Sequence, residues 1–109
     1  MKVAIIGSRT KKIDSLEKYL PKNCCEIVSG GANGIDKCAA EMANSKGLKL
    51  TEFLPEYNRY GRGAPLVRNK KIVEYSDIVL AFWDGSSKGT LFVIEYCKRI
   101  GKECKVILI

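Results

Sequence analysis

The segment Ser29-Gly30-Gly31-Ala32-Asn33-Gly34-Ile35-Asp36 has the composition of an anion-binding loop. Because glycine has no Cβ, the backbone N–H groups of such a loop can approach an oxyanion closely, and a helix that begins there adds partial positive charge. A phosphate group is the ligand that this chemistry favours. The alternative is a tight strand-to-helix turn that needs glycine only for its backbone angles, with Asp36 as the cap of the helix.

Two further polar segments supply hydrogen-bond donors. Gly7-Ser8-Arg9 combines a small residue with a hydroxyl and a guanidinium, which suit the capture of phosphate or carboxylate unless the arginine is merely solvated. Asp84-Gly85-Ser86-Ser87-Lys88-Gly89-Thr90 adds hydroxyls, a lysine and the N–H groups of an expected helix start. Its order is not that of a Walker A loop, so we expect a different phosphate site here.

The most basic segment runs from Tyr57 to Lys71 and contains five basic residues and no acid. Tyr57 and Tyr60 alternate there with Arg59 and Arg62, and Arg68 and Asn69 follow. Aromatic rings beside cations suit a nucleobase stacked next to its phosphate, and the glycines of this segment suit a lid that orders on a ligand. The alternative is a solvated basic loop.

Apolar runs alternate with helical patterns and define the elements that must position these segments. We expect strands near 2–6, 26–28, 48–54, 78–83 and 106–109, because these runs are nearly continuous in apolar residues. Helical spacing predicts helices over 13–20, from Asp36 to Gly47, from Pro65 onward and over 90–100. The stretch 55–65 shows no regular pattern.

This alternation predicts an α/β fold, because strands separated by helices pair in parallel through right-handed crossovers. We expect one domain over 1–109, a three-layer α/β/α sandwich with a Rossmann-like, doubly wound sheet of five strands in the order 3-2-1-4-5. Ligands bind such sheets at the carboxyl ends of the strands, beside the switch point between strands 1 and 4. That rule brings the segments 7–12, 29–36, 57–69 and 84–90 together.

Composition narrows the functional classes. The chain has 109 residues and a formal net charge of +7, which favours an anionic partner, with solubility alone as the alternative. It has no histidine, which excludes histidine-based triads and most catalytic zinc sites. No apolar run approaches the ~18–20 residues of a membrane span, and no signal-peptide core is present at the start, so we expect no membrane association and a cytoplasmic location.

The five cysteines, 24, 25, 38, 97 and 104, form no CxxC pair. An odd number of cysteines without such a pair indicates reduced thiols that fill small apolar spaces. We expect neither a metal site nor a bound cofactor.

Four segments together resemble the SLOG superfamily, the Rossmann-like group of the DprA-like (Smf-like) DNA-processing proteins and the LOG-like phosphoribohydrolases. They are Val3-Ala4-Ile5-Ile6-Gly7-Ser8-Arg9, the glycine segment 29–36, Val67-Arg68-Asn69-Lys70-Lys71-Ile72-Val73, and Ser76-Asp77 followed by Ser87-Lys88-Gly89-Thr90. The resemblance covers almost the whole chain, and its order and spacing are most similar to the DprA core and to the short stand-alone SLOG proteins of the YspA type.

The resemblance implies a pocket for a nucleotide, a nucleotide-derived ligand or a nucleic-acid phosphate, with single-stranded nucleic acid as the partner of DprA-like proteins. The matching positions are Ser8, Arg9, Ser29, Gly30, Gly31, Gly34, Asp36, Arg68 and Asn69. Because SLOG proteins often pair through their helices, the resemblance is also compatible with a homodimer. The sequence lacks the domains that flank the DprA core, so recombinase loading is not part of the expectation.

LOG-like enzymes cleave the N-glycosidic bond of a nucleotide and carry a PGGxGTxxE motif. Here the first acid after Thr90 is Glu95, and at about 100° per residue it faces another side of the helix than the motif's glutamate. We therefore expect a binding module and assign no catalytic residue. The alternative is a nucleotide phosphoribohydrolase that uses Asp36 or Asp84, and a structural subunit of a larger assembly is the third class.

Overall fold

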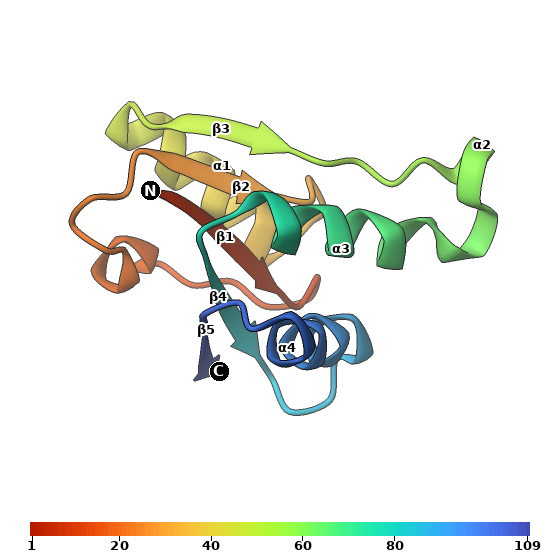
Figure 1. Cartoon of the computed structure of the whole chain (residues 1–109). Coiled ribbons are helices and arrows are strands. Elements are labelled where there is room, and N and C mark those ends of the chain that lie inside the picture. The colour runs from red at the N-terminus through yellow and green to blue at the C-terminus, as the bar shows by residue number, and fades with distance from the viewer.

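The sheet is parallel throughout and has five strands. The computed structural model describes all residues, Met1–Ile109. The strands are β1 (Lys2–Gly7), β2 (Glu26–Ser29), β3 (Lys49–Glu52), β4 (Ile78–Trp83) and β5 (Cys104–Leu108). They lie in the order β3-β2-β1-β4-β5, which confirms the predicted topology (Figure 1).

Helices cover both faces of this sheet. The 3-10 turn η1 (Leu16–Tyr19) and α1 (Ile35–Lys46) pack on one face, and α3 (Ala64–Tyr75) and α4 (Lys88–Ile100) pack on the other. The helical turn α2 (Tyr57–Tyr60) and the 3-10 turn η2 (Gly61–Gly63) lead into α3 and extend beyond the sheet (Figure 1). The result is the predicted three-layer, Rossmann-like sandwich. None of its helices combines the length and the apolar character that crossing a membrane requires.

The position of β1 at the centre of the sheet explains why its sequence is apolar without interruption. Val3 and Ile5 contribute to the core under η1 and α1, whereas Ala4 and Ile6 contribute to the core under α3 and α4. Successive side chains of a strand point to opposite faces, and here both faces are covered.

The predicted helix over 13–20 is wrong, because only the turn η1 forms there. Leu16 is buried, and Ile13 and Leu20 pack against the same core, so the apolar residues anchor the segment without a continuous helix. The bonds that form run from Lys18 to Ser15 and from Leu20 to Glu17. Three-residue spacing of this kind is typical of a short 3-10 turn.

The stretch 55–65 is more regular than its sequence suggests, since α2 and η2 occupy residues 57–63. Pro65 lies in the first turn of α3, as predicted. The third strand is shorter than expected at Lys49–Glu52, and α4 begins at Lys88 rather than Thr90.

Candidate functional site

A cavity of about 380 Å³ opens at the carboxyl ends of β1 and β4, beside the switch point of the sheet. Its volume lies within the range of about 300–1,000 Å³ that is typical of small-molecule sites. Ten residues predicted from the sequence line it: Ser8, Arg9, Gly30, Asp36, Arg68, Asn69, Asp84, Ser87, Gly89 and Thr90. The structure thus brings together residues from the four segments that the topology rule selected.

The remaining predicted residues lie outside this lining. From the loops these are Ser29, Gly31, Asn33, Gly34, Gly85 and Lys88, and from the basic segment they are Tyr57, Arg59, Tyr60 and Arg62. Conversely, Ile6, Gly7, Thr10, Ala32, Pro65 and Leu66 line the cavity and were not among the predicted site residues. Each of these six lies within or next to a predicted segment, so proximity in sequence was the only signal that could have found them.

Arg68 is the most buried cation of the cavity, with 8% of its surface exposed. Its Nη1 donates to the carbonyl oxygen of Gly30 at 2.6 Å and to that of Phe53 at 3.4 Å. Its Nε is buried and has no hydrogen-bond partner. Burial lowers the pKa of the guanidinium, while the charge of Asp36 opposes that shift and the charge of Arg9 adds to it.

Two glycines of the segment 29–36 lie in close contact with other protein atoms. A Cβ on Gly30 would lie 2.5 Å from Nη1 of Arg68. A Cβ on Gly34 would lie 2.4 Å from the backbone oxygen of Ser8, and Gly34 also has a φ of +73°. These approaches support the tight-turn interpretation of both residues, because the neighbouring protein atoms already account for the missing side chains.

Asp36 does not cap α1, so that prediction is wrong. The N-cap is Gly34, and Asp36 is the second residue of the helix. Its carboxylate is buried and accepts a hydrogen bond from the N–H of Ala32 at 3.1 Å. Burial raises the pKa of the Asp36 carboxyl, and the Ala32 N–H and the Arg68 charge oppose that rise. The group therefore holds the loop in shape and faces the cavity at the same time.

Hydroxyl groups follow the end of β1. The Oγ of Ser8 lies 3.0 Å from Oγ1 of Thr10 and accepts the N–H of Thr10 at 3.2 Å. The backbone oxygen of Ser8 accepts the N–H of Ile35 at 3.1 Å, which ties this loop to the start of α1. Arg9 between them is exposed. This leaves the Arg9 guanidinium unburied and two hydroxyl groups at the rim of the cavity.

The start of α4 forms another wall. Asp84 Oδ1 accepts the N–H groups of Ser86 at 2.9 Å and Ser87 at 2.8 Å, and these bonds lower the pKa of the Asp84 carboxyl. Ser87 is the N-cap and accepts the N–H of Thr90, while its backbone oxygen accepts the indole N–H of Trp83 at 3.1 Å. The N–H groups of Lys88 and Gly89, the first two residues of α4, have no acceptor within the helix. They are therefore free to bind an anion.

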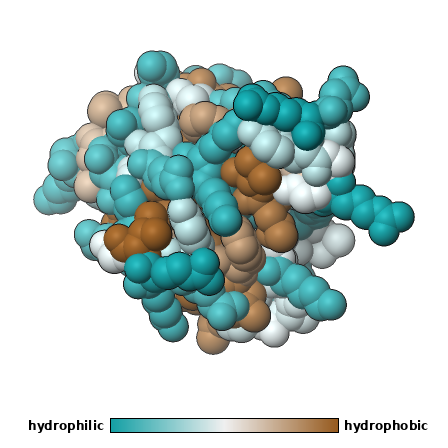
Figure 2. Space-filling model, turned by 45° about the vertical axis from the view of Figure 1, so that its right-hand side comes forward, coloured by the Kyte–Doolittle hydropathy of each residue, from teal (hydrophilic) through white to brown (hydrophobic).

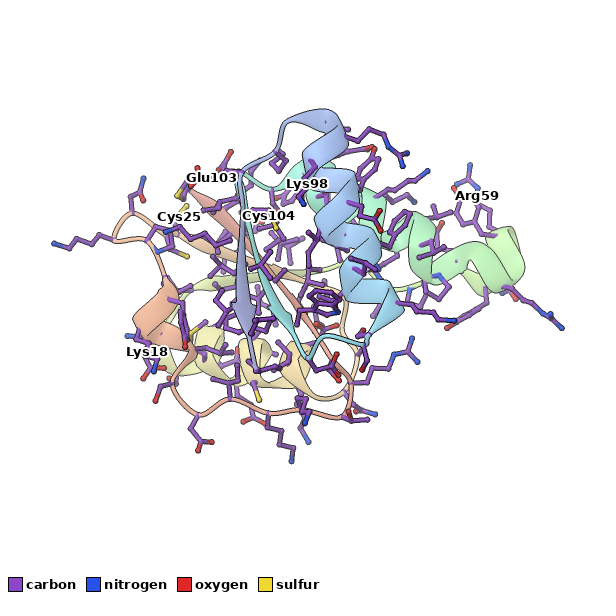
Figure 3. All side chains as sticks on the ribbon, turned by 90° about the horizontal axis from the view of Figure 1, so that it is seen from below. Lys18, Cys25, Arg59, Lys98, Glu103 and Cys104 are labelled. Carbon is purple, nitrogen blue, oxygen red and sulfur yellow. The ribbon has the colours of Figure 1, made fainter.

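The tyrosines of the basic segment lie away from the cavity, on α2. Arg59, at the far end of the molecule from β5 (Figure 3), lies 5.3 Å from the ring centroid of Tyr60. Lys71 lies 5.5 Å from the same ring. Two cations therefore already contact Tyr60, whereas Tyr57 is 56% exposed.

Long hydrophilic side chains stand out on the face drawn in Figure 2, with apolar patches between them.

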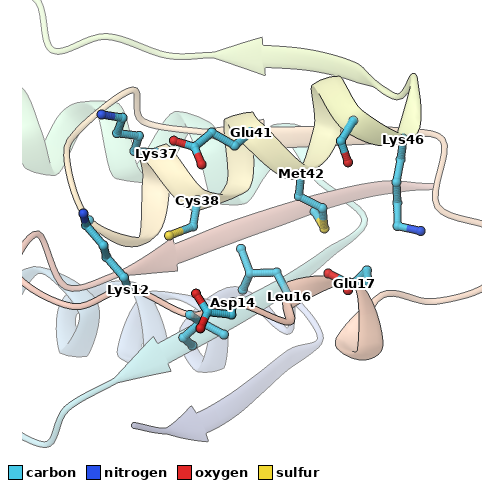
Figure 4. A pocket seen from close by; sticks show the side chains of 12 residues that line it. Lys12, Asp14, Leu16, Glu17, Lys37, Cys38, Glu41, Met42 and Lys46 are labelled. Carbon is cyan, nitrogen blue, oxygen red and sulfur yellow. The ribbon is translucent and has the colours of Figure 1, made fainter.

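A larger cavity, of about 640 Å³, lies between the 12–17 segment and α1 (Figure 4). Three lysines and three carboxylates line it: Lys12, Lys37, Lys46, Asp14, Glu17 and Glu41. Their formal charges cancel, and only Gly34 among the predicted site residues lines it. The smaller cavity is the better candidate, because it lies at the switch point and includes the N-terminus of α4.

The cysteines are free thiols, and no cluster of three or more histidine, cysteine, aspartate or glutamate residues could hold a metal ion. Comparison of the chain with family models, with curated proteins and with solved structures finds no match.

Proposed function

We propose that this protein binds a phosphate group of a nucleotide or of single-stranded nucleic acid in the cavity at the switch point. The observation that carries the proposal is the convergence there of two guanidinium groups with the free N–H groups of the α4 N-terminus. Helix N-termini and arginine guanidinium groups both suit phosphate, the first through free N–H groups and the second through paired hydrogen bonds. The resemblance of the same segments to SLOG proteins supports this class of ligand.

The carboxylates of the cavity are compatible with an anion because local donors already engage them. Asp84 accepts the N–H groups of its own loop, and Asp36 accepts the N–H of Ala32. The buried Nε of Arg68 still lacks an acceptor.

The basic residues outside the cavity favour single-stranded nucleic acid as a ligand in addition to a free nucleotide. Arg59 and Arg62 are exposed on α2 and η2, which lead directly into the helix that carries Arg68. A strand of nucleic acid bound at the cavity would meet these cations with its next phosphates. Tyr57, which is exposed, offers a ring for stacking.

The test is calorimetric titration with adenosine monophosphate, inorganic phosphate and a short oligothymidylate, using Arg9→Ala and the matched variant Arg62→Ala. Both arginines are exposed, so neither variant should disturb folding. We expect Arg9→Ala to weaken binding of all three ligands by about tenfold or more. We expect Arg62→Ala to weaken only the oligonucleotide. Absence of binding, or equal effects of the two variants on inorganic phosphate, contradicts the proposal.

One observation favours hydrolysis as a second candidate function. Asp36 lines the cavity, and burial raises the pKa of its carboxyl, as is common for acid–base groups. Glu95, by contrast, is exposed and does not line the cavity. Chromatographic detection of free adenine from adenosine monophosphate, lost in Asp36→Asn, would establish a phosphoribohydrolase. Binding without release of adenine would leave the binding module.

A further inference from the structure

The two edges of the sheet differ in how they face solvent. The edge strand β3 exposes the charged residues Lys49 and Glu52. The opposite edge strand β5 exposes Val106 by 45% and Leu108 by 73%. Charged edges prevent strands from pairing with other molecules, and apolar edges permit it. The β5 edge has less of this protection, because Lys105 is the only exposed charged residue within that strand.

The free backbone of β5 can be identified from its bonds to β4. The oxygen of Glu103 accepts the N–H of Val79, and the N–H of Ile109 donates to the oxygen of Trp83, both at 3.0 Å. Because the backbone groups of a strand alternate in direction, Cys104, Val106 and Leu108 point their N–H and C=O groups away from β4. Seen from below, no other ribbon segment passes in front of β5 (Figure 3).

We propose that β5 pairs with β5 of a second copy of this chain, antiparallel about a two-fold axis at Val106. The two sheets then form one continuous sheet of twice the width. This register pairs every outward-facing residue: Val106 with itself, and Cys104 with Leu108 of the second copy. Such a symmetric contact uses the same surface twice, which is the usual geometry of homodimers.

Charge disfavours the neighbouring register in which the axis passes through Lys105. Lys105 is the only charged residue between Cys104 and Ile109. An axis at Lys105 would place two lysines directly opposite each other, which is unfavourable. An axis at Val106 places Lys105 opposite Ile107 of the second copy instead. Pairing in this register therefore places no like charges opposite each other and uses every outward-facing backbone group of the strand, which is why a second copy is the favoured occupant.

The dimer leaves the candidate site open, because no residue of β5 lines the cavity. It is also independent of the proposed function, so either proposal can fail alone. Each copy carries a net charge of +7, so the copies repel at long range. Added salt screens that repulsion, and the dimer should therefore tighten as ionic strength rises, whereas phosphate binding should weaken.

Sedimentation equilibrium of the full chain over a range of concentrations and salt tests the proposal. We expect a species of about twice 12.1 kDa whose dissociation constant falls with added salt. Val106→Lys should raise that constant by about tenfold or more, because it places a charge on the symmetry axis. Leu54→Lys is the matched control, since Leu54 is 63% exposed outside β5, and it should change nothing. A monomer at all concentrations, or a dimer insensitive to Val106→Lys, overturns the proposal.

Cross-linking tests the register without relying on a destabilised variant. In a Cys25→Ser background, which removes the exposed native thiol, Val106→Cys should form a covalent dimer under mild oxidation. Opposed residues on antiparallel strands lie at about 5.5 Å between Cα atoms, within the range of disulfides. Lys49→Cys on the β3 edge is the control and should stay monomeric. Equal cross-linking of both variants contradicts the pairing.

Discussion

Nη1 of Arg68 lies 2.6 Å from the carbonyl oxygen of Gly30, and this bond ties the middle of α3 to the loop that follows β2. Thirty-eight residues separate the two groups in sequence. The bond makes Arg68 a structural residue as well as a candidate ligand group, so its substitution should change stability and affinity together.

Arg68→Ala should lower the free energy of unfolding by about 1–3 kcal/mol, because it leaves the buried Gly30 oxygen without a donor. Urea denaturation followed by circular dichroism measures this. Arg62→Ala, which removes an exposed arginine, should change stability by less than about 0.5 kcal/mol. Equal stability of Arg68→Ala and the unmodified protein would show that the Gly30 bond contributes nothing.

Gly30→Ala should destabilise the protein, although replacing glycine with alanine normally stabilises a fold by lowering the conformational entropy of the unfolded chain. The new Cβ would lie 2.5 Å from Nη1 of Arg68 and force the guanidinium out of its position. Gly63→Ala is the matched case, since a Cβ there would meet nothing within 4 Å and the φ of Gly63 is negative. That variant should gain about 0.4–1 kcal/mol. The two melting temperatures should therefore move in opposite directions.

Tyr57 should contribute more than Tyr60 to binding of single-stranded nucleic acid. Stacking on an exposed ring is worth about 1–3 kcal/mol per base, whereas the ring of Tyr60 already contacts Arg59 and Lys71. Fluorescence anisotropy of labelled oligonucleotides with Tyr57→Ala and Tyr60→Ala measures the difference. Single strands should bind better than duplex, and log affinity should fall linearly with log salt. A larger loss in Tyr60→Ala would reverse the assignment.

Two carboxylates should affect stability in opposite ways as pH changes. Hydrogen bonds from Thr51 and Tyr75, both at 2.6 Å, lower the pKa of Glu26, whereas burial raises the pKa of Asp36. Ionised Glu26 stabilises the fold above its unfolded pKa of about 4.3, and that contribution is lost as pH falls through its lower folded pKa. Asp36 favours the folded state below its unfolded pKa of about 3.9 and loses that contribution as pH rises toward its folded pKa.

Glu26→Gln should therefore be less stable than the unmodified protein at pH 7, and the difference should shrink as pH falls below about 4. Asp36→Asn should be at least as stable as the unmodified protein at pH 7, because an amide oxygen can still accept the Ala32 N–H. Thermal denaturation across pH 3–8 measures both. Parallel pH profiles for the two variants would contradict the assignment.

The order of the strands was predictable because each apolar run is bounded by polar or glycine residues, and parallel pairing then leaves few topologies. The structure of the 13–20 segment was not predictable. Ile13, Leu16 and Leu20 have helical spacing, yet they reach the same core from a chain that forms only a short turn. Local spacing cannot distinguish these cases when tertiary packing supplies most of the stability.

The sequence predicted which segments form the candidate site but not what each of their residues does there. The glycines of 29–36 indicated a phosphate loop, whereas in the structure Gly30 accommodates Arg68 and Gly34 accommodates the Ser8 backbone. Both contacts join residues far apart in the sequence. A sequence shows that a glycine is present, but only the fold shows which atoms occupy the space beside it.

The indole of Trp83 is hydrogen-bonded to the backbone of Ser87, a residue of the cavity wall, and the chain has a single tryptophan. The tryptophan emission of the protein therefore comes from one place, the end of β4 that leads toward α4. A ligand that engages the α4 N-terminus changes the surroundings of that one fluorophore directly. The protein thus carries an intrinsic optical reporter of its own candidate site, readable without a label.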